Sequence, residues 1–284
     1  MSCPDCVRGH VHPGTPKGRI ETVHGLQTYV SEPEDTPESE IKGIVVFIPD
    51  AFGWEFVNNR LLADRYAETG KFRVYLPEFM NGTAVPAWGL DTIRAVMKTQ
   101  TVWDWISKPY HIACALYVMP TFMIRNRPAK SYPLVESFFV SLRQSPEGQR
   151  LPIGAAGFCW GGKHTLLLSH GASTTINGAK RNLIDAGFTG HPSMLALPGD
   201  IEKMVIPVSF ALAELDSSLK GEQIEMIKRF VEEKEEVGGE VKVYVGAGHG
   251  FCVRADVAVE KSYRQAAESE EQAVEFFRKQ FAKI

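Results

Sequence analysis

Apolar positions along this chain fall into short uninterrupted runs that alternate with stretches of helical period. The run at 43–49 is Gly-Ile-Val-Val-Phe-Ile-Pro, which is typical of a parallel strand buried on both faces. Residues 60–67 follow with a spacing that indicates a helix, and 72–76 predict the next strand. This half of the chain therefore predicts one strand-helix-strand unit.

The same alternation returns in the second half of the chain. Further strands are predicted at 151–156, 182–188, 206–213 and 241–245, and helices at 162–170, 222–237 and 265–282. Strands that alternate with helices predict an α/β fold with a mostly parallel central sheet and helices on both faces. We expect a single domain spanning 1–284.

Three segments depart from this alternation. Residues 20–30 predict two short strands about a His24-Gly25 turn, and residues 1–18, which lack periodicity, predict an extended N-terminal arm. Residues 77–150 are harder to assign and are expected to cover the site in part. Tryptophans on the predicted helices of this segment are expected to fill the core or this cover: Trp88, Trp103 and Trp105.

Composition narrows the class of protein. A chain of 284 residues with 44% hydrophobic content can bury one large core, and a net charge of −3 disfavours nucleic acid as a partner. The longest apolar stretch, 112–124, is too short to span a bilayer, and no secretory signal pattern opens the chain. Five cysteines, an odd number, favour reduced thiols. We expect a cytoplasmic protein with no membrane association, and self-assembly into a homo-oligomer is compatible with the sequence.

The segment 157–162, Gly-Phe-Cys-Trp-Gly-Gly, has the pattern of a nucleophile elbow with cysteine in place of serine. Its glycines permit a sharp turn from strand to helix, and the central side chain stands above the end of the sheet. A predicted strand precedes it and a predicted helix follows. Cys159 is therefore the candidate nucleophile, and the alternative is a buried structural cysteine.

A cysteine nucleophile needs a base, and the base needs an orienting acid. His249 lies in a glycine-rich turn after the last predicted strand, and Asp216 follows the strand before it. The alternatives are a surface or capping role for His249, and for Asp216 a helix N-cap, with Glu214 as rival acid. In an open sheet, the carboxyl ends of the strands are where ligands bind, which favours the catalytic assignment.

The order Cys, Asp, His is that of α/β-hydrolases. With Gly-His-Gly-Phe at 248–251, the chain resembles the dienelactone hydrolase family, particularly its fungal branch, from about residue 43 to the C-terminus. The N-terminal Cys-Pro-Asp-Cys at 3–6 also resembles the fungal members of this family. The resemblance implies an α/β-hydrolase fold and a cofactor-independent hydrolase of small lactones or activated esters, which acts through a thioester on Cys159.

The resemblance also bears on the segment 48–53. Family members usually place a glutamate after the first long strand, where it helps to deprotonate the cysteine, but this chain has Asp50. The backbone N–H groups of Ala51 and Trp160 are the expected oxyanion donors. The alternative for Asp50 is a cap on the following turn.

Substrate contacts are expected around the same two turns. Bacterial members hold an anionic substrate with arginines, and Arg254 lies one position later than their pattern. Its alternative is a solvated side chain or a pair with Asp256. Phe52 and Phe251 are the expected apolar contacts.

The N-terminal cysteines and histidines are potential zinc ligands: Cys3, Cys6, His10 and His12. Their spacing is too compressed for an ordinary zinc finger, and we expect no bound metal. A rival to catalysis is a protein of the same fold that binds a small ligand without turnover or senses oxidants through Cys159.

Overall fold

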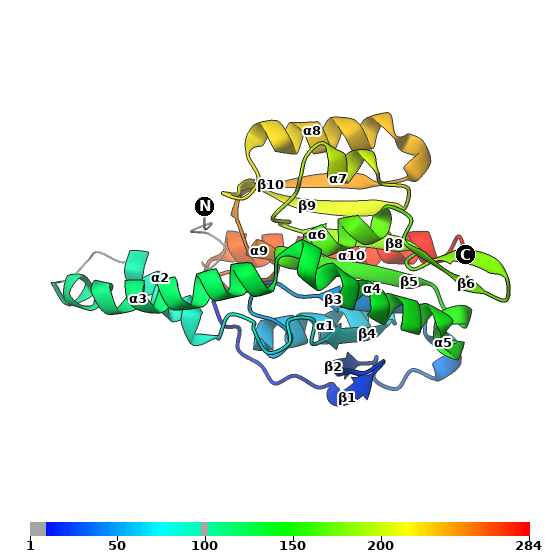
Figure 1. Cartoon of the computed structure of the whole chain (residues 1–284), viewed down its shortest axis with the longest axis horizontal. Coiled ribbons are helices and arrows are strands. Elements are labelled where there is room, and N and C mark those ends of the chain that lie inside the picture. The colour runs from blue at the N-terminus through cyan, green and yellow to red at the C-terminus, as the bar shows by residue number, and fades with distance from the viewer. Residues whose placement is uncertain (1–9, 98–101) are drawn as a thin grey trace.

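The computed structural model describes residues 10–97 and 102–284, which form an eight-stranded central sheet between two layers of helices (Figure 1). In spatial order the strands are β1 (Arg19–Val23), β2 (Leu26–Ser31), β4 (Arg73–Pro77), β3 (Ile44–Ile48), β5 (Ile153–Phe158), β8 (Ala186–Gly190), β9 (Val208–Leu215) and β10 (Glu240–Gly248). The strands from β4 to β10 are parallel, and β1 and β2 join antiparallel at one edge. The predicted mostly parallel sheet is confirmed.

The central strands are buried on both faces, as their uninterrupted apolar runs predict. Every residue of β3, β5 and β8 is buried. Ile48 lies opposite Gly157, and Gly157 lies opposite Thr189. This register brings the carboxyl ends of the three strands to one edge, where Cys159 and Asp50 follow directly in the chain.

Helices cover both faces of the sheet. One layer holds α1 (Val57–Gly70), α9 (Phe251–Arg254) and α10 (Glu260–Phe281), and the other holds α4 (Pro128–Gln144), α6 (Trp160–Ser169), α7 (Gly199–Glu202) and α8 (Gly221–Glu233). In the first layer, Phe277 and Phe281 of α10 pack edge-on against Phe72 at ring-centroid separations of 6.2 and 5.6 Å. Burial of one such ring contributes about 1.5–3 kcal/mol.

One predicted strand begins later than expected. Residues 179–182 do not join the central sheet, because β7 (Ala179–Asn182) pairs with β6 (Ser173–Ile176) in a separate hairpin. Asn177 and Gly178 form its turn with φ values of 50° and 79°, the left-handed pair that a two-residue hairpin favours. The strand predicted at 182–188 is therefore β8, which starts at Ala186.

Within its described residues, the segment 77–150 forms four helices: α2 (Trp88–Met97), α3 (Val102–Arg125), α4 and α5 (Pro146–Arg150). Elsewhere, short 3-10 turns span Glu38–Glu40 and Glu235–Val237. While α4 packs on the body, α2 and α3 form a helical hairpin that projects away from the sheet (Figure 1).

The expectation that tryptophans in this segment fill the core or a cover was wrong. Trp88, Trp103 and Trp105 are 48%, 76% and 64% exposed. The physical reason is the projection of the hairpin, because its helices pack mainly on each other and leave their outer surface without a neighbouring element.

Candidate active site

The turn that carries Cys159 joins β5 to α6 and is strained. Cys159 has φ 52° and ψ −109°, a conformation that costs a side-chain-bearing residue about 1–3 kcal/mol. The turn also packs tightly, since a Cβ atom on Gly161 would lie 1.8 Å from the Ile48 carbonyl oxygen. Only glycine there allows the elbow to meet the end of β3.

The Cys159 side chain faces the loop that follows β8. The residue is 3% exposed, and its Sγ lies 3.6 Å from the Oγ of Ser193. The backbone fixes the two turns to each other, because Ser193 N–H donates to the Cys159 carbonyl at 3.0 Å and Cys159 N–H donates to the Gly190 carbonyl at 3.1 Å. The thiol is thus held in a defined, nearly enclosed position.

His249 and Asp216 form a buried pair. Nδ1 of His249 lies 2.8 and 2.9 Å from the two carboxylate oxygens of Asp216. An ionised carboxylate can only accept hydrogen bonds, so Nδ1 carries the proton, and Nε2 lies on the side of the ring away from Asp216. Nε2 is therefore the ring nitrogen that remains for Cys159, whose hydrogen bond to His249 helps to raise the pKa of the imidazole. Ser218 N–H also donates to Asp216, but this contact closes a turn and does not cap a helix, because the N-cap of the next helix, α8, is Lys220.

Electrostatics couple this pair to the cysteine. Burial lowers the pKa of His249, but the charge of Cys159 and the hydrogen bond to Asp216 outweigh it and raise that pKa to about 10. The arrangement therefore favours an imidazolium beside a thiolate. The rival acid, Glu214, is exposed and accepts a hydrogen bond from Gly246 N–H at 2.8 Å instead.

Asp50 and Arg254 form a second buried pair. The Arg254 guanidinium donates to the Asp50 carboxylate, and both side chains are fully buried. Asn59 Nδ2 and Phe52 N–H donate to the other carboxylate oxygen at 3.1 and 3.2 Å. Burial raises the pKa of Asp50, Arg254 opposes that rise and Cys159 adds to it. Asp50 therefore caps its turn and is coupled to both the arginine and the cysteine.

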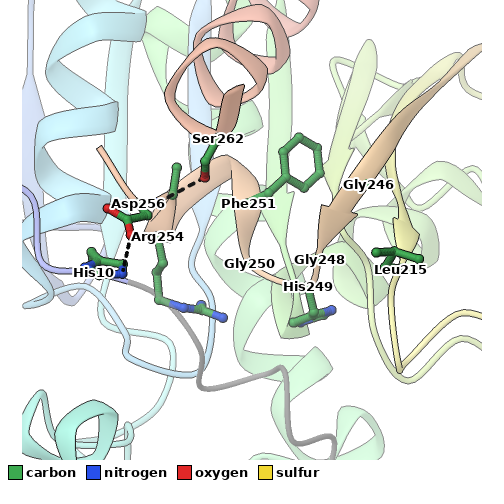
Figure 2. A pocket seen from close by; sticks show the side chains of 11 residues that line it. His10, Leu215, Gly246, Gly248, His249, Gly250, Phe251, Arg254, Asp256 and Ser262 are labelled. Carbon is green, nitrogen blue, oxygen red and sulfur yellow. Dashed lines mark hydrogen bonds and ion pairs between the residues drawn. The ribbon is translucent and has the colours of Figure 1, made fainter. Parts of the chain in front are cut away.

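Arg254 thus contacts Asp50. The sequence had led us to expect that it holds a substrate carboxylate or pairs with Asp256. Asp256 pairs with His10 at 3.1 Å. In Figure 2 the Arg254 guanidinium and the His249 imidazole point to the same side of the segment that carries them, and Phe251 points to the opposite side. A cavity of about 330 Å³ lies beside this segment, and Cys159 is not among its lining residues.

The two expected apolar contacts, Phe52 and Phe251, are both buried, and Phe251 is among the residues that line this cavity. The ring of Phe52 lies 5.2 Å from the guanidinium carbon of Arg254. Phe251 packs between Tyr244 and His191, with ring-centroid distances of 4.8 and 5.9 Å. Both rings therefore support neighbouring polar side chains.

The two backbone N–H groups expected to bind an oxyanion belong to the turns that follow β3 and β5. Trp160 is the first residue of α6, and an N–H group in a first helical turn has no acceptor within its helix. Ala51 belongs to the turn after β3, and its carbonyl accepts from Val85 N–H at 2.8 Å. The Ile48 carbonyl touches Gly161, which brings the two turns together.

His191 and Ser193 belong to the site but were missed by the sequence analysis. The His191 ring lies edge-on to His249 at 4.9 Å, and both its nitrogens are buried without a hydrogen-bond partner among the described residues. Burial lowers the pKa of His191 well below 6.5, so the ring is neutral. His191 and Ser193 both follow the strand predicted at 182–188, and this position at the carboxyl end of a strand is the sequence feature that could have identified them.

The N-terminal cluster is described only in part. Cys3 and Cys6 lie outside the described residues. His12 Nε2 contacts the Ala255 carbonyl at 2.9 Å, and His12 N–H donates to Asn58 at 2.8 Å. Residues 10–18 thus run along the body as an arm, and the absence of metal stays a prediction.

Comparison with known proteins extends these observations. The model of the dienelactone hydrolase family matches residues 26–281. A hydrolase named tropI from Talaromyces stipitatus is 29% identical and covers 98% of this chain and 95% of its own length. Dienlactone hydrolase 1 from Gibberella moniliformis is 25% identical, over 88% of this chain and 82% of its own.

Solved structures agree on the fold. A dienelactone hydrolase from Anabaena variabilis superposes with a TM-score of 0.56 at 14% identity and covers 95% of this chain and 99% of that chain. A thermophilic esterase from Thermogutta terrifontis gives 0.57 at 13% identity, with 93% and 96% covered. The predicted α/β-hydrolase fold is confirmed, and because the family model spans nearly the whole sequence, the chain belongs to the dienelactone hydrolase family.

Proposed function

We propose that this protein hydrolyses lactones or activated esters through a covalent thioester on Cys159. The observation that carries the proposal is the buried His249–Asp216 pair, which is electrostatically coupled to a cysteine on a strained elbow. Membership in a family of hydrolases supports the reaction class. A merely structural cysteine would need neither the strained turn nor the imidazole.

In the first half of the reaction, the Cys159 thiolate attacks the carbonyl carbon of the ester. The new S–C bond pushes the carbonyl electron pair onto oxygen, where the N–H groups of Ala51 and Trp160 stabilise the negative charge. When the carbonyl re-forms, the C–O bond breaks, and the His249 imidazolium gives its Nε2 proton to the departing alkoxide. In a lactone this alcohol stays on the acyl group.

In the second half, the neutral His249 takes a proton from water as the water attacks the thioester. The S–C bond breaks, the carboxylic acid leaves, and the thiolate and imidazolium are restored. Asp216 keeps the Nδ1 proton in place and stabilises the imidazolium in both halves. No cofactor enters either half.

A substrate carrying a carboxylate would find Arg254 already paired. Such a carboxylate would compete with Asp50 for the guanidinium, because a fork of N–H donors can serve two acceptors. Loss of the ion pair would make Asp50 more basic, since Arg254 is what opposes the rise in its pKa. Any Cys159 still in the thiol form would thereby lose its proton to Asp50 more readily when an anionic substrate binds.

Turnover of a panel of p-nitrophenyl esters and unsaturated lactones tests the proposal. We expect hydrolysis by the wild type, and loss of it after iodoacetamide treatment and in Cys159→Ala. Cys252→Ala is the matched control, because Cys252 is equally buried and its burial raises the pKa of its thiol to about 12. Full activity in Cys159→Ala, or equal losses in both variants, would contradict the proposal. No turnover of any substrate would favour a ligand-binding or redox-sensing protein.

A further inference from the structure

Helix α3 exposes an unusual concentration of apolar surface. Among the side chains whose burial the structure describes, ten of the twenty large apolar ones that are exposed lie on this one helix, with exposed fractions from 39% to 77%. They lie on the surface turned away from α2, while residues such as Val118 and Met119 face the α2–α3 contact. The projecting hairpin in Figure 1 thus carries an uncovered apolar side.

The exposed positions of α3 repeat every seven residues. Trp103, Tyr110 and Tyr117 follow one seven-residue series, and Ile106, Ala113 and Pro120 follow a second series three residues later. All six are exposed. Apolar residues alternating three and four apart form the seam by which one helix packs along another. We call these six residues the α3 seam.

The charge of the helix argues against a lipid surface as the occupant. From Trp105 to Ile124 the sequence contains one charged residue, Lys108, and its ammonium lies over the ring of Trp105 at 4.5 Å. Helices that lie on membranes carry a polar face rich in lysine and arginine. Among the described helices, none has both the length and the apolar character needed to cross a bilayer.

The exposed area matches what a stable protein interface requires. An aromatic side chain of this size can bury about 150–250 Å², so the exposed apolar groups of α3 offer on the order of 1,000 Å² per chain. Stable interfaces bury about 800 Å² on each partner. Closed two-fold pairing of identical chains is the commonest way to cover such a surface.

From these observations we propose that the α3 seam is a dimer interface, with α3 of a second copy packed antiparallel against it. Because the two helices run in opposite directions, each residue of the seam faces a different residue of the other copy. Trp103 then lies opposite Pro120, Ile106 opposite Tyr117, and Tyr110 opposite Ala113. Each layer combines a larger with a smaller side chain, as close packing requires. The antiparallel direction also leaves the two bodies at opposite ends of the paired hairpins.

The oligomeric state tests this interface independently of catalysis. Sedimentation velocity of the full chain over a concentration series should give a dimer for the wild type and a monomer for Tyr110→Glu/Tyr117→Glu. Tyr263→Glu, on α10 and 59% exposed, is the matched control and should stay dimeric. Circular dichroism should be unchanged in all three. A wild type that stays monomeric at every concentration, or a double variant that still dimerises, would overturn the proposal.

The direction of packing is tested by disulfide formation. In a Cys114→Ser background, protein with Tyr110→Cys is mixed with protein carrying Ala113→Cys and oxidised. Antiparallel packing predicts a mixed 110–113 disulfide as the main product, identified by mass spectrometry of the digest, and none with Tyr263→Cys as partner. A main product joining 110 to 110, or flotation of monomers with phosphatidylcholine/phosphatidylserine vesicles, would contradict the proposed dimer.

Discussion

At the scale of single residues, the contact between His249 and Asp216 decides the catalytic account. Asp216→Asn keeps the shape but removes the charge that holds the Nδ1 proton, so turnover should fall by about 10³–10⁴ with a smaller change in substrate binding. Glu214→Gln should stay near wild type because Glu214 contacts Gly246 instead. Steady-state kinetics of both variants decide this, and the opposite ranking would make Glu214 the acid.

Asp216→Asn should also shift the pH dependence of kcat/KM. The His249 pKa is raised to about 10, so the imidazolium that protonates the leaving group persists until the pH approaches that value. The alkaline limb of kcat/KM reports this pKa in the free enzyme. Without the Asp216 charge the pKa falls, and the limb should move to lower pH in Asp216→Asn. An unmoved limb would remove His249 from the proton-transfer step.

Arg254 and Asp50 offer a test of stability as well as binding. Arg254→Met leaves the buried Asp50 carboxylate without its cation, which should lower the free energy of unfolding by about 3–5 kcal/mol. Asp50→Asn added to it should restore part of that loss, because no buried charge remains. Urea unfolding measures both, with the exposed Arg229→Met as control.

Kinetics then separate the roles of this pair. If Arg254 also binds substrate, Arg254→Met should raise KM for carboxylate-bearing substrates more than for neutral esters. Equal effects on both substrate classes would leave Arg254 a purely structural residue. A double variant no more stable than Arg254→Met would show that the pair acts through packing.

The sequence was sufficient to predict the three catalytic candidates, but it could not predict the ion pair between Asp50 and Arg254. Cys159, Asp216 and His249 each follow a predicted strand, and parallel strands bring their carboxyl ends to one edge. The Asp50–Arg254 pair joins residues 204 positions apart and depends on how a four-residue helix, α9, turns Arg254 inward. No local pattern specifies that turn.

At the scale of elements, the elbow depends on one close approach. Gly161→Ala would place a methyl group 1.8 Å from the Ile48 carbonyl oxygen, so either α6 or β3 must move. We expect a lower thermal midpoint and loss of most activity. Gly221→Ala, at the start of α8 with nothing within 4 Å, should change neither quantity. An active Gly161→Ala with an unchanged midpoint would show that the elbow tolerates displacement.

The boundaries of strands were predicted well where the sequence contains an uninterrupted apolar run. The apolar runs of β3 and β5 located both strands to within two residues. The start of β8 was misplaced, because residues 179–182 find a local partner across the Asn177-Gly178 turn. Polar strands that pair with each other carry no apolar run that a hydrophobic pattern could show.

At the scale of the whole molecule, the sheet was predictable and the projecting hairpin was not. The alternating strands and helices fix a layered α/β body, since only that arrangement buries their apolar faces. Trp103 and Trp105 of α3 were expected to lie in the core or a cover, yet within one chain they remain exposed. In the proposed dimer, a second copy covers the side of α3 that carries Trp103.

In the proposed reaction, an ester passes its acyl group to Cys159. The most direct measurement is rapid acid quench of the enzyme during turnover of an activated ester, followed by intact mass and peptide mapping. We expect one added acyl group on the peptide containing Cys159, and none in Cys159→Ala under the same conditions. An acyl group on any other residue, or turnover by Cys159→Ala at the wild-type rate, would contradict it.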